Sequence, residues 1–142
     1  MASCDCNTCE PSLKEPYFTI QFFSAIDSTK KIVVIDTVNA IWGKDIRYYQ
    51  DTTSRYRFPL SMHDDITELK LVYRDTTNYN VSIVNNITIN YQREITKLND
   101  NNILVKCYWN NYEADFKSHY SYCQDTTAIQ CLSNARVIKA YL

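Results

Sequence analysis

The chain has 142 residues, of which 45% are hydrophobic and 22% charged, and its formal net charge is -1. This composition is typical of one globular domain and argues against intrinsic disorder. Basic and acidic residues nearly balance, so the chain lacks the positive field that binding to nucleic-acid phosphates requires, and we expect no nucleic-acid partner. The single glycine excludes the glycine-rich loops that hold nucleotide cofactors, and we expect no cofactor.

The first sixteen residues, MASCDCNTCEPSLKEP, are polar and contain three cysteines and two prolines. We interpret them as a cysteine-rich tether that precedes a single domain at residues 17–142. Within the tether, Met1-Ala2-Ser3-Cys4 resembles the end of a bacterial lipoprotein signal, in which small residues precede a cysteine that is acylated after cleavage. This resemblance implies lipid attachment at Cys4 and contact with a membrane through the lipid.

From residue 17 onward, short stretches of β-branched and aromatic residues alternate with stretches of Asp, Asn, Ser and Thr. Several stretches alternate apolar with polar side chains, as at Ile87, Ile89 and Tyr91, which is typical of strands with one face on a core. Turn signals recur about every 8 to 12 residues, which predicts an all-β fold, either an antiparallel β-sandwich or an open barrel of about seven to nine strands. The candidate strands lie at residues 17–23, 31–37, 46–49, 56–60, 66–73, 80–83, 87–95, 103–112 and 136–141.

Asparagine replaces glycine in the expected turns, because Asn tolerates left-handed backbone conformations better than most residues. We expect turns at Asn85-Asn86, at Asn110-Asn111 and over residues 99–102. Two short segments, 61–68 and 126–135, are the best helix candidates.

The six cysteines raise the question of disulfide bonds. If Cys4 carries lipid, five thiols remain and at most two bridges form, whereas three pairs are open to a chain with an unmodified Cys4. We expect Cys123 to pair with Cys131, which closes a short loop before the last strand, and one N-terminal cysteine to pair with Cys107. The disulfide candidates are Cys6, Cys9, Cys107, Cys123 and Cys131.

An alternative hypothesis is a cytosolic, cysteine-rich zinc-binding protein, because Cys6 and Cys9 have the C-x2-C spacing of one half of a zinc site. A structural zinc site needs a second close pair of thiolates. Cys123 and Cys131 are too widely spaced to supply it, so we expect no metal site. Metal analysis of the purified chain separates the two hypotheses.

Twelve tyrosines and two tryptophans suggest either an aromatic core or a ligand-binding face. Strands prefer aromatic residues and small sandwiches fill their cores with them, so the core interpretation is favoured. The candidates for an exposed ligand face are Tyr108, Trp109 and Tyr112, with Trp42 as a further ring. Coplanar, solvent-facing rings at these positions would favour a carbohydrate-binding module, and buried rings would remove the basis for it.

Five Asp-Ser/Thr motifs resemble the O-glycosylation motif of secreted Bacteroidota proteins, in which an Asp precedes a modified Ser or Thr. Asp-Thr pairs are also ordinary turn formers, which explains part of their abundance. The O-glycosylation candidates are Ser28, Thr37, Thr52, Thr76 and Thr126.

As a whole, the chain resembles the small Bacteroidota cell-envelope lipoproteins of unknown function. The resemblance rests on the cysteine-rich start, on Pro16 followed by a first strand, on Phe58-Pro59-Leu60, on Cys107 within a later strand and on an apolar last strand. It implies a lipid-anchored protein of the cell envelope, in the outer membrane or the periplasm. It brings no catalytic residue and no known ligand.

The sequence gives little support for an enzyme. His63 and His119 lie in polar surroundings, and Cys123 follows His119 by four residues. We expect that thiol to be oxidised to a disulfide rather than to act as a nucleophile, because an exported chain meets an oxidising compartment. The preferred hypothesis is therefore a non-catalytic binding or accessory module with an envelope protein or a glycan as its partner.

Overall fold

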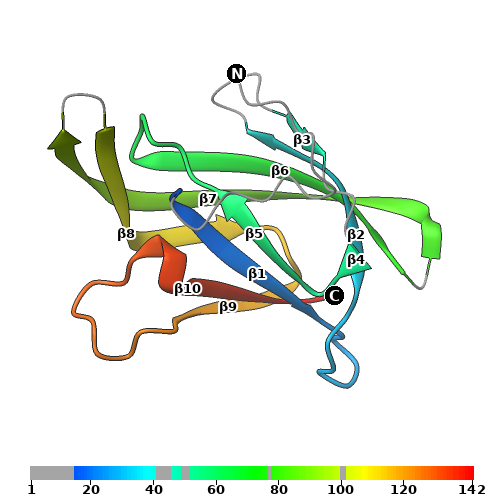
Figure 1. Cartoon of the computed structure of the whole chain (residues 1–142). Coiled ribbons are helices and arrows are strands. Elements are labelled where there is room, and N and C mark those ends of the chain that lie inside the picture. Colours follow the sequence, from blue (N-terminus) through cyan, green and yellow to red (C-terminus); the bar gives the residue numbers. More distant parts are fainter. Residues whose placement is uncertain (1–14, 41–45, 49–51, 77, 100–101) are drawn as a thin grey trace.

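Two β-sheets pack face to face in this protein, as the computed structural model in Figure 1 shows. The structure describes residues 15–40, 46–48, 52–76, 78–99 and 102–142. These ranges contain ten strands and one short 3-10 turn, η1 (Ser133–Ala135). The predicted all-β fold, an antiparallel β-sandwich or open barrel, is confirmed as a β-sandwich. None of the described residues belongs to a helix long and apolar enough to cross a membrane.

The smaller sheet has four strands in the order β5-β1-β10-β9. β1 pairs antiparallel with β5 and parallel with β10, so that Gln21 lies opposite Lys139 and Phe23 opposite Tyr141. This parallel pair differs from a purely antiparallel sandwich, and it needs a long crossover connection, which the rest of the domain supplies. The four strands are β1 (Tyr17–Phe23), β5 (Arg55–Pro59), β9 (Ser118–Cys123) and β10 (Arg136–Tyr141).

The larger sheet is antiparallel, with five strands in the order β3-β2-β6-β7-β8 and a sixth strand, β4, that also pairs with β2. On the left of Figure 1, the end of β7 and the start of β8 extend beyond β1 and β5. The strands are β2 (Val33–Ala40), β3 (Ile46–Tyr48), β4 (Thr52–Thr53), β6 (Ile66–Asp75), β7 (Asn78–Asn99) and β8 (Asn102–Ala114).

Two strands expected at residues 80–83 and 87–95 form the single long strand β7, so the turn predicted at Asn85-Asn86 is wrong. Asn85 lies opposite Leu71 of β6 and is buried, with 8% of its surface exposed. Its side-chain oxygen accepts a hydrogen bond from the Tyr73 hydroxyl. Because this bond satisfies the buried amide oxygen, the strand continues through a residue that normally favours turns.

The other asparagine-rich positions interrupt strands in two different ways. At Asn110-Asn111 the pairing of β7 and β8 shifts by one residue, which makes Asn110 the extra residue of a β-bulge and not a turn. Of the turn predicted over residues 99–102, Asn99 ends β7, Asn102 begins β8 and the two pair with each other, while residues 100–101 lie outside the described residues.

Neither helix candidate forms an α-helix. Residues 61–65 make a bend before β6 begins at Ile66, and residues 126–135 contain only the three-residue turn η1. The sequence analysis also missed strand β9, which ends at Cys123.

The core lies between the two sheets and is rich in aromatic side chains, as expected. β1 is its centre: the Phe18 ring lies 5.7 Å from Phe58 and 6.0 Å from Trp109 of the opposite sheet, measured between ring centroids. Further along β1, the Phe22 ring lies 5.6 Å from Tyr73 of the larger sheet. These contacts bury large apolar surfaces and join the sheets along one strand.

A buried polar network fixes the bend that precedes β6. The Tyr91 hydroxyl donates to the Ser61 carbonyl oxygen at 2.7 Å and lies 2.7 Å from the Thr67 hydroxyl. The Thr67 hydroxyl in turn accepts a hydrogen bond from the Ser61 amide at 2.8 Å. Every member therefore has a partner, although Tyr91 and Thr67 are almost fully buried.

Replacing Tyr91 with Phe should lower the free energy of unfolding by about 1 to 3 kcal/mol, because the Ser61 carbonyl and the Thr67 hydroxyl lose a buried partner. Urea denaturation measures this as a lower midpoint with an unchanged slope. The control is Tyr120→Phe, which removes the hydroxyl of an exposed ring. It should change the free energy of unfolding by less than about 0.5 kcal/mol. Equal midpoints for the two variants would contradict the role of the network.

Candidate functional site

Cys123 and Cys131 form a disulfide, as predicted, with their Cα atoms 6.0 Å apart. The bridge closes the loop between β9 and η1 and holds Cys131 beside β8, where its carbonyl oxygen accepts a hydrogen bond from the Trp109 amide at 2.8 Å. Disulfides persist in oxidising compartments and are rare in the cytosol. The bridge therefore points to a location outside the reducing cytosol.

The predicted pairing of Cys107 with an N-terminal cysteine is wrong, because Cys107 is a free thiol. It points into the core with Val105 and Trp109, the other inward residues of β8, and only 1% of its surface is exposed. Burial raises the pKa of the thiol to about 11. Such a thiol is inert at neutral pH. Cys4, Cys6 and Cys9 lie outside the described residues.

The rings predicted to form an exposed ligand face are not solvent-facing together, because Trp109 is buried and Tyr108 and Tyr112 are half-buried. Trp109 belongs to the core, with 9% of its surface exposed, and the Arg136 guanidinium covers its ring at 5.6 Å from the centroid. Tyr112 is half-buried and its hydroxyl is bonded to the His119 ring nitrogen Nδ1 at 2.7 Å. Trp42 lies outside the described residues.

The two histidines lie in different parts of the fold, His119 on β9 and His63 in the bend before β6. His119 is held by Tyr112 on the inner side of β9, and Cys123, its possible partner thiol, is committed to the disulfide. His63 is exposed in the bend before β6, with its amide bonded to the Ser61 hydroxyl. In the described part of the chain, no three His, Cys, Asp or Glu side chains are grouped to hold a metal ion.

Two of the five Asp-Ser/Thr motifs form exposed turns. Asp27 accepts hydrogen bonds from the amide and hydroxyl of Thr29, and Asp125 accepts the same pair from Thr127. These bonds lower the pKa of both carboxyl groups. The middle residues, Ser28 and Thr126, are therefore displayed at the surface; Ser28 also has a positive φ of 60°.

Thr37 lies in β2 of the larger sheet, and Thr76 directly follows β6. Asp36, which precedes Thr37, accepts hydrogen bonds from the Arg74 guanidinium at 2.8 to 3.2 Å. Thr76 donates from its hydroxyl to the Ile32 carbonyl at 3.0 Å. Thr52 lies in β4, and its side chain is outside the described residues. O-glycosylation stays a prediction at all five positions.

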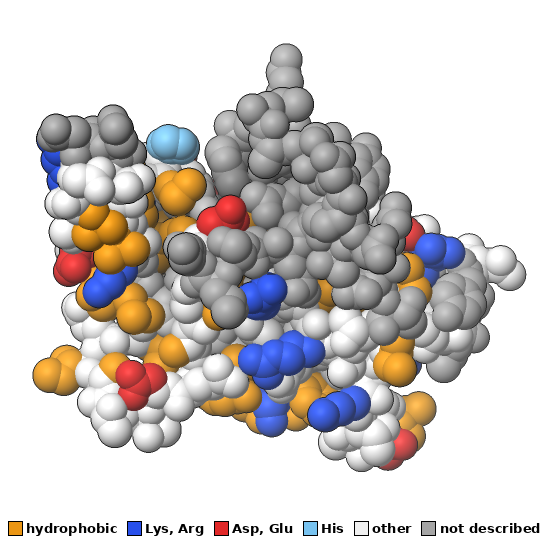
Figure 2. All heavy atoms as spheres, viewed as in Figure 1, with side chains coloured by type: hydrophobic (Ala, Val, Ile, Leu, Met, Phe, Trp, Pro, Cys, Tyr) orange, Lys and Arg blue, Asp and Glu red, His pale blue; other side chains and the backbone are white. Residues whose placement is uncertain are grey.

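The outer face of the four-stranded sheet carries aromatic side chains around one lysine. β1, β10 and β9 lie side by side, and their outward positions bring these residues together. Figure 2 shows Lys and Arg side chains among hydrophobic ones over the lower half of the view, where Figure 1 draws these strands. We call this cluster the aromatic-lysine face: Phe23, Tyr120, Tyr122, Lys139 and Tyr141.

Three rings of the aromatic-lysine face lie in nearly parallel planes. The Phe23 and Tyr141 rings are 5.5 Å apart at 28°, and the Tyr141 and Tyr120 rings are 6.2 Å apart at 23°. The Lys139 ammonium lies 5.2 Å from the centroid of Phe23, 5.7 Å from Tyr120 and 5.5 Å from Tyr122. Contacts of this length are attractive cation-π interactions, and they hold the ammonium among the rings.

Hydrogen bonds link the polar atoms of the same residues. A bond from the Lys139 ammonium lowers the pKa of the Tyr120 hydroxyl, and a bond with Tyr141 acts in the same direction. The bond with Tyr120 raises the pKa of Lys139 and of Tyr141. The face therefore presents a stable positive charge and phenol hydroxyls beside apolar ring surface.

The sequence analysis missed this face because it did not predict β9. A signal was present: Tyr120 and Tyr122 alternate along one stretch, and Lys139 and Tyr141 alternate along the last strand. Each pair by itself is ordinary for a strand surface.

Comparisons with protein-family models, with curated proteins and with solved structures returned no match to this chain. Its function is therefore argued from the geometry of its own residues.

Replacing Lys139 with Met should raise the pKa of Tyr120 toward the ordinary tyrosine value, because the hydrogen bond from the ammonium favours the ionised hydroxyl. The measurement is an NMR titration of the chain labelled at the tyrosine ring carbons. Lys70→Met, which removes an exposed lysine from β6 of the other sheet, is the matched control. An unchanged Tyr120 titration in Lys139→Met would show that the ammonium does not contact this hydroxyl.

Proposed function

We propose that this chain is a non-catalytic binding module of the cell envelope, and that the aromatic-lysine face is its carbohydrate-binding surface. The observation that carries the proposal is the set of near-parallel rings around Lys139 on an outer sheet face. Binding sites combine apolar and aromatic surface with a few fixed polar groups. Here the rings supply the apolar part, and the ammonium and phenol hydroxyls supply the polar part.

A carbohydrate fits this surface because sugar rings also combine apolar C–H faces with hydroxyl groups. The phenol hydroxyls of Tyr120, Tyr122 and Tyr141 can both donate and accept hydrogen bonds. The Lys139 ammonium adds a positive charge and only donates. This combination favours a glycan that carries carboxylate groups over a neutral one, since a hydrogen bond between two ionised groups is the stronger kind.

Polygalacturonic acid and dextran, as acidic and neutral polysaccharides, are suitable probes in affinity gel electrophoresis. The chain should be retarded more by polygalacturonic acid than by dextran. Tyr120→Ala and Lys139→Met should each weaken binding about three- to tenfold, because they remove an aromatic contact or the charge. Lys70→Met is the control for the loss of one positive charge and should bind like the unmodified chain. Equal weakening by Lys139→Met and Lys70→Met would assign the binding to net charge alone.

The envelope part of the proposal has two supports, the disulfide and the resemblance around Cys4. A chain with lipid at Cys4 is held at a membrane because each buried acyl CH2 contributes roughly 0.8 kcal/mol, and two or more chains make the attachment stable. Residues 5–16 then separate the sandwich from the lipid surface. The aromatic-lysine face binds a glycan in the same compartment.

Expressing the full reading frame in its native host, with Cys4 replaced by Ala, tests the anchor. The unmodified protein should fractionate with membranes and carry acyl mass on its N-terminal peptide, whereas Cys4→Ala should do neither. Cys6→Ala is the matched control, because it removes a neighbouring cysteine and leaves the acylation position intact. Unchanged membrane retention and N-terminal mass in Cys4→Ala would show that Cys4 is no anchor.

A further inference from the structure

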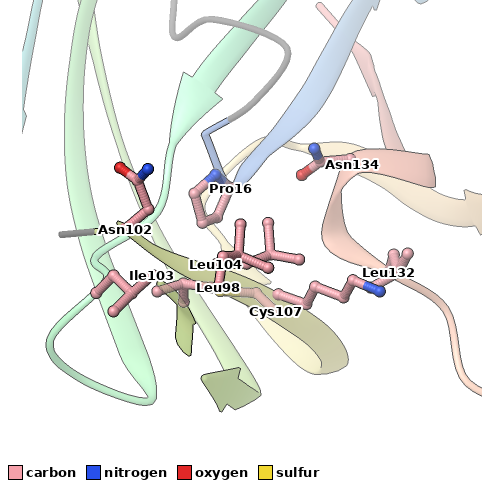
Figure 3. Close-up of a pocket in the computed structure, with 10 residues that line it drawn as sticks. Pro16, Leu98, Asn102, Ile103, Leu104, Cys107, Leu132 and Asn134 are labelled. Carbon is pink, nitrogen blue, oxygen red and sulfur yellow. The ribbon is translucent and has the colours of Figure 1, made fainter. Parts of the chain in front are cut away.

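A groove separates the edge of β8 from the start of the four-stranded sheet (Figure 3). Every residue from 102 to 107 lines it on the β8 side, and Pro16, Leu132 and Asn134 line the other. Its volume is about 520 Å³, within the roughly 300 to 1,000 Å³ of typical ligand pockets. Six consecutive residues of one strand line a groove only when the groove runs along the edge of that strand.

Among the described residues, the edge of β8 in this groove has backbone groups without a partner. β8 is the last strand of its sheet, with β7 on one side. On its other side the chain itself begins a further strand: the Trp109 amide donates to the Cys131 carbonyl, and Tyr108 forms a bridge with Leu132. After Leu132 the chain turns away into η1. In the described part of the chain, hydrogen bonding along this edge of β8 therefore ends at the bridge between Tyr108 and Leu132.

Along a strand, the backbone N–H and C=O groups of every second residue face the same side. The residues that continue this row of hydrogen bonds are therefore those whose backbone groups face the same side as those of Trp109. Beyond Cys107, which is only 1% exposed and adjoins this bridge, they are Val105 and Ile103. Within the described part of the chain, the backbone hydrogen bonds of β8 on this side belong to the bridge between Tyr108 and Leu132, so Val105 and Ile103 present donors and acceptors to the groove. An open strand edge of this kind is a template for another strand.

The side chains beside this edge are apolar. Leu98 is 61% exposed and Ile103 is 65% exposed, and both lie at the rim of the groove (Figure 3). Among the described lining residues, the one charged side chain is Lys106. The opposite wall is fixed, because the Asn134 side chain accepts a hydrogen bond from the Tyr17 amide at 2.9 Å and donates to the Glu15 carbonyl at 3.3 Å.

We propose that this groove is a docking site for an extended segment of a partner protein, which joins the larger sheet as a strand beside β8. Backbone hydrogen bonds to Ile103 and Val105 supply affinity, and alternate side chains of the segment supply specificity. The segment carries apolar residues that cover Leu98 and Ile103, and an acidic side chain that faces Lys106. The proposal does not depend on the carbohydrate face, which lies on the other sheet.

The probe is a fluorescein-labelled, ten-residue peptide in which Val and Thr alternate and one Thr is replaced by Glu. Its binding to the full chain is measured by fluorescence anisotropy. A second peptide of the same sequence is N-methylated at alternate amides and cannot pair with a strand edge. We expect the plain peptide to bind at least tenfold more tightly than the N-methylated one. Equal affinities overturn the proposal.

Hydrogen exchange on the unmodified chain shows where the peptide binds. Exchange of the Ile103 and Val105 amides should slow when the peptide is added, while that of the outer edge of β9 should not change. No slowing at these two amides at saturating peptide overturns the proposal. It is also overturned if the amides are already protected in a dimer of this chain without peptide, because the occupant is then a second copy.

Two substitutions at Ile103, on the edge of β8, provide a matched comparison of peptide affinity. Ile103→Pro removes one outward amide and leaves the bonds with β7 intact, since proline is tolerated where an edge N–H faces solvent. Peptide affinity should fall about fivefold or more, as expected for the loss of one backbone hydrogen bond, whereas Ile103→Val should retain it. Lys139→Met should also retain it. If Ile103→Pro is unfolded by circular dichroism, the exchange result on the unmodified chain decides.

Discussion

The sandwich depends on the aromatic side chains that β1 turns inward. Phe18 and Phe22 reach across the interface to Trp109 and Tyr73, so one strand of the smaller sheet touches two strands of the larger. β1 is also the strand that pairs with both β5 and β10. Removing either ring would lose buried apolar surface and leave a cavity between the sheets, and such substitutions in cores cost several kcal/mol.

The candidate ligand surface follows from the same geometry. Because successive side chains of a strand point to opposite faces, Phe22 in the core places Phe23 on the outside, and Ile138 in the core places Lys139 on the outside. The parallel pairing of β1 with β10 then puts Phe23 directly opposite Tyr141. The aromatic-lysine face is thus held by the rigid part of the fold, and its rings need little ordering when a ligand binds.

The sequence predicted the strands whose pattern is local. β1 and β10 begin and end where the alternation of apolar and β-branched residues indicated, because those residues form the core themselves. The length of β7 was not predictable, since the amide of Asn85 is satisfied by Tyr73, a residue of another strand. β9 escaped prediction because its inward positions are His119, Ser121 and Cys123, which give no apolar alternation.

The candidate site was predicted less well than the fold, for a related reason. Trp109 and Tyr112 lie close together in the sequence, but the side chain of Trp109 points inward from β8 and its ring is part of the core. The residues around Lys139 come from three strands that are separated in sequence and meet only in the completed sheet. The Cys123 and Cys131 bridge was within reach of sequence reasoning because it closes a short local loop.

The parallel pair of β1 and β10 also has a consequence for the order of folding. The first strand of the smaller sheet pairs with the last one to be synthesised, and contacts between such distant segments form slowly because a large loop must close first. A growing chain can assemble β6, β7 and β8 by local hairpins and can pair β1 with β5, but the other side of β1 lacks a partner until residues 136–141 have been made. The smaller sheet therefore closes around β1 only after most of this chain has been synthesised.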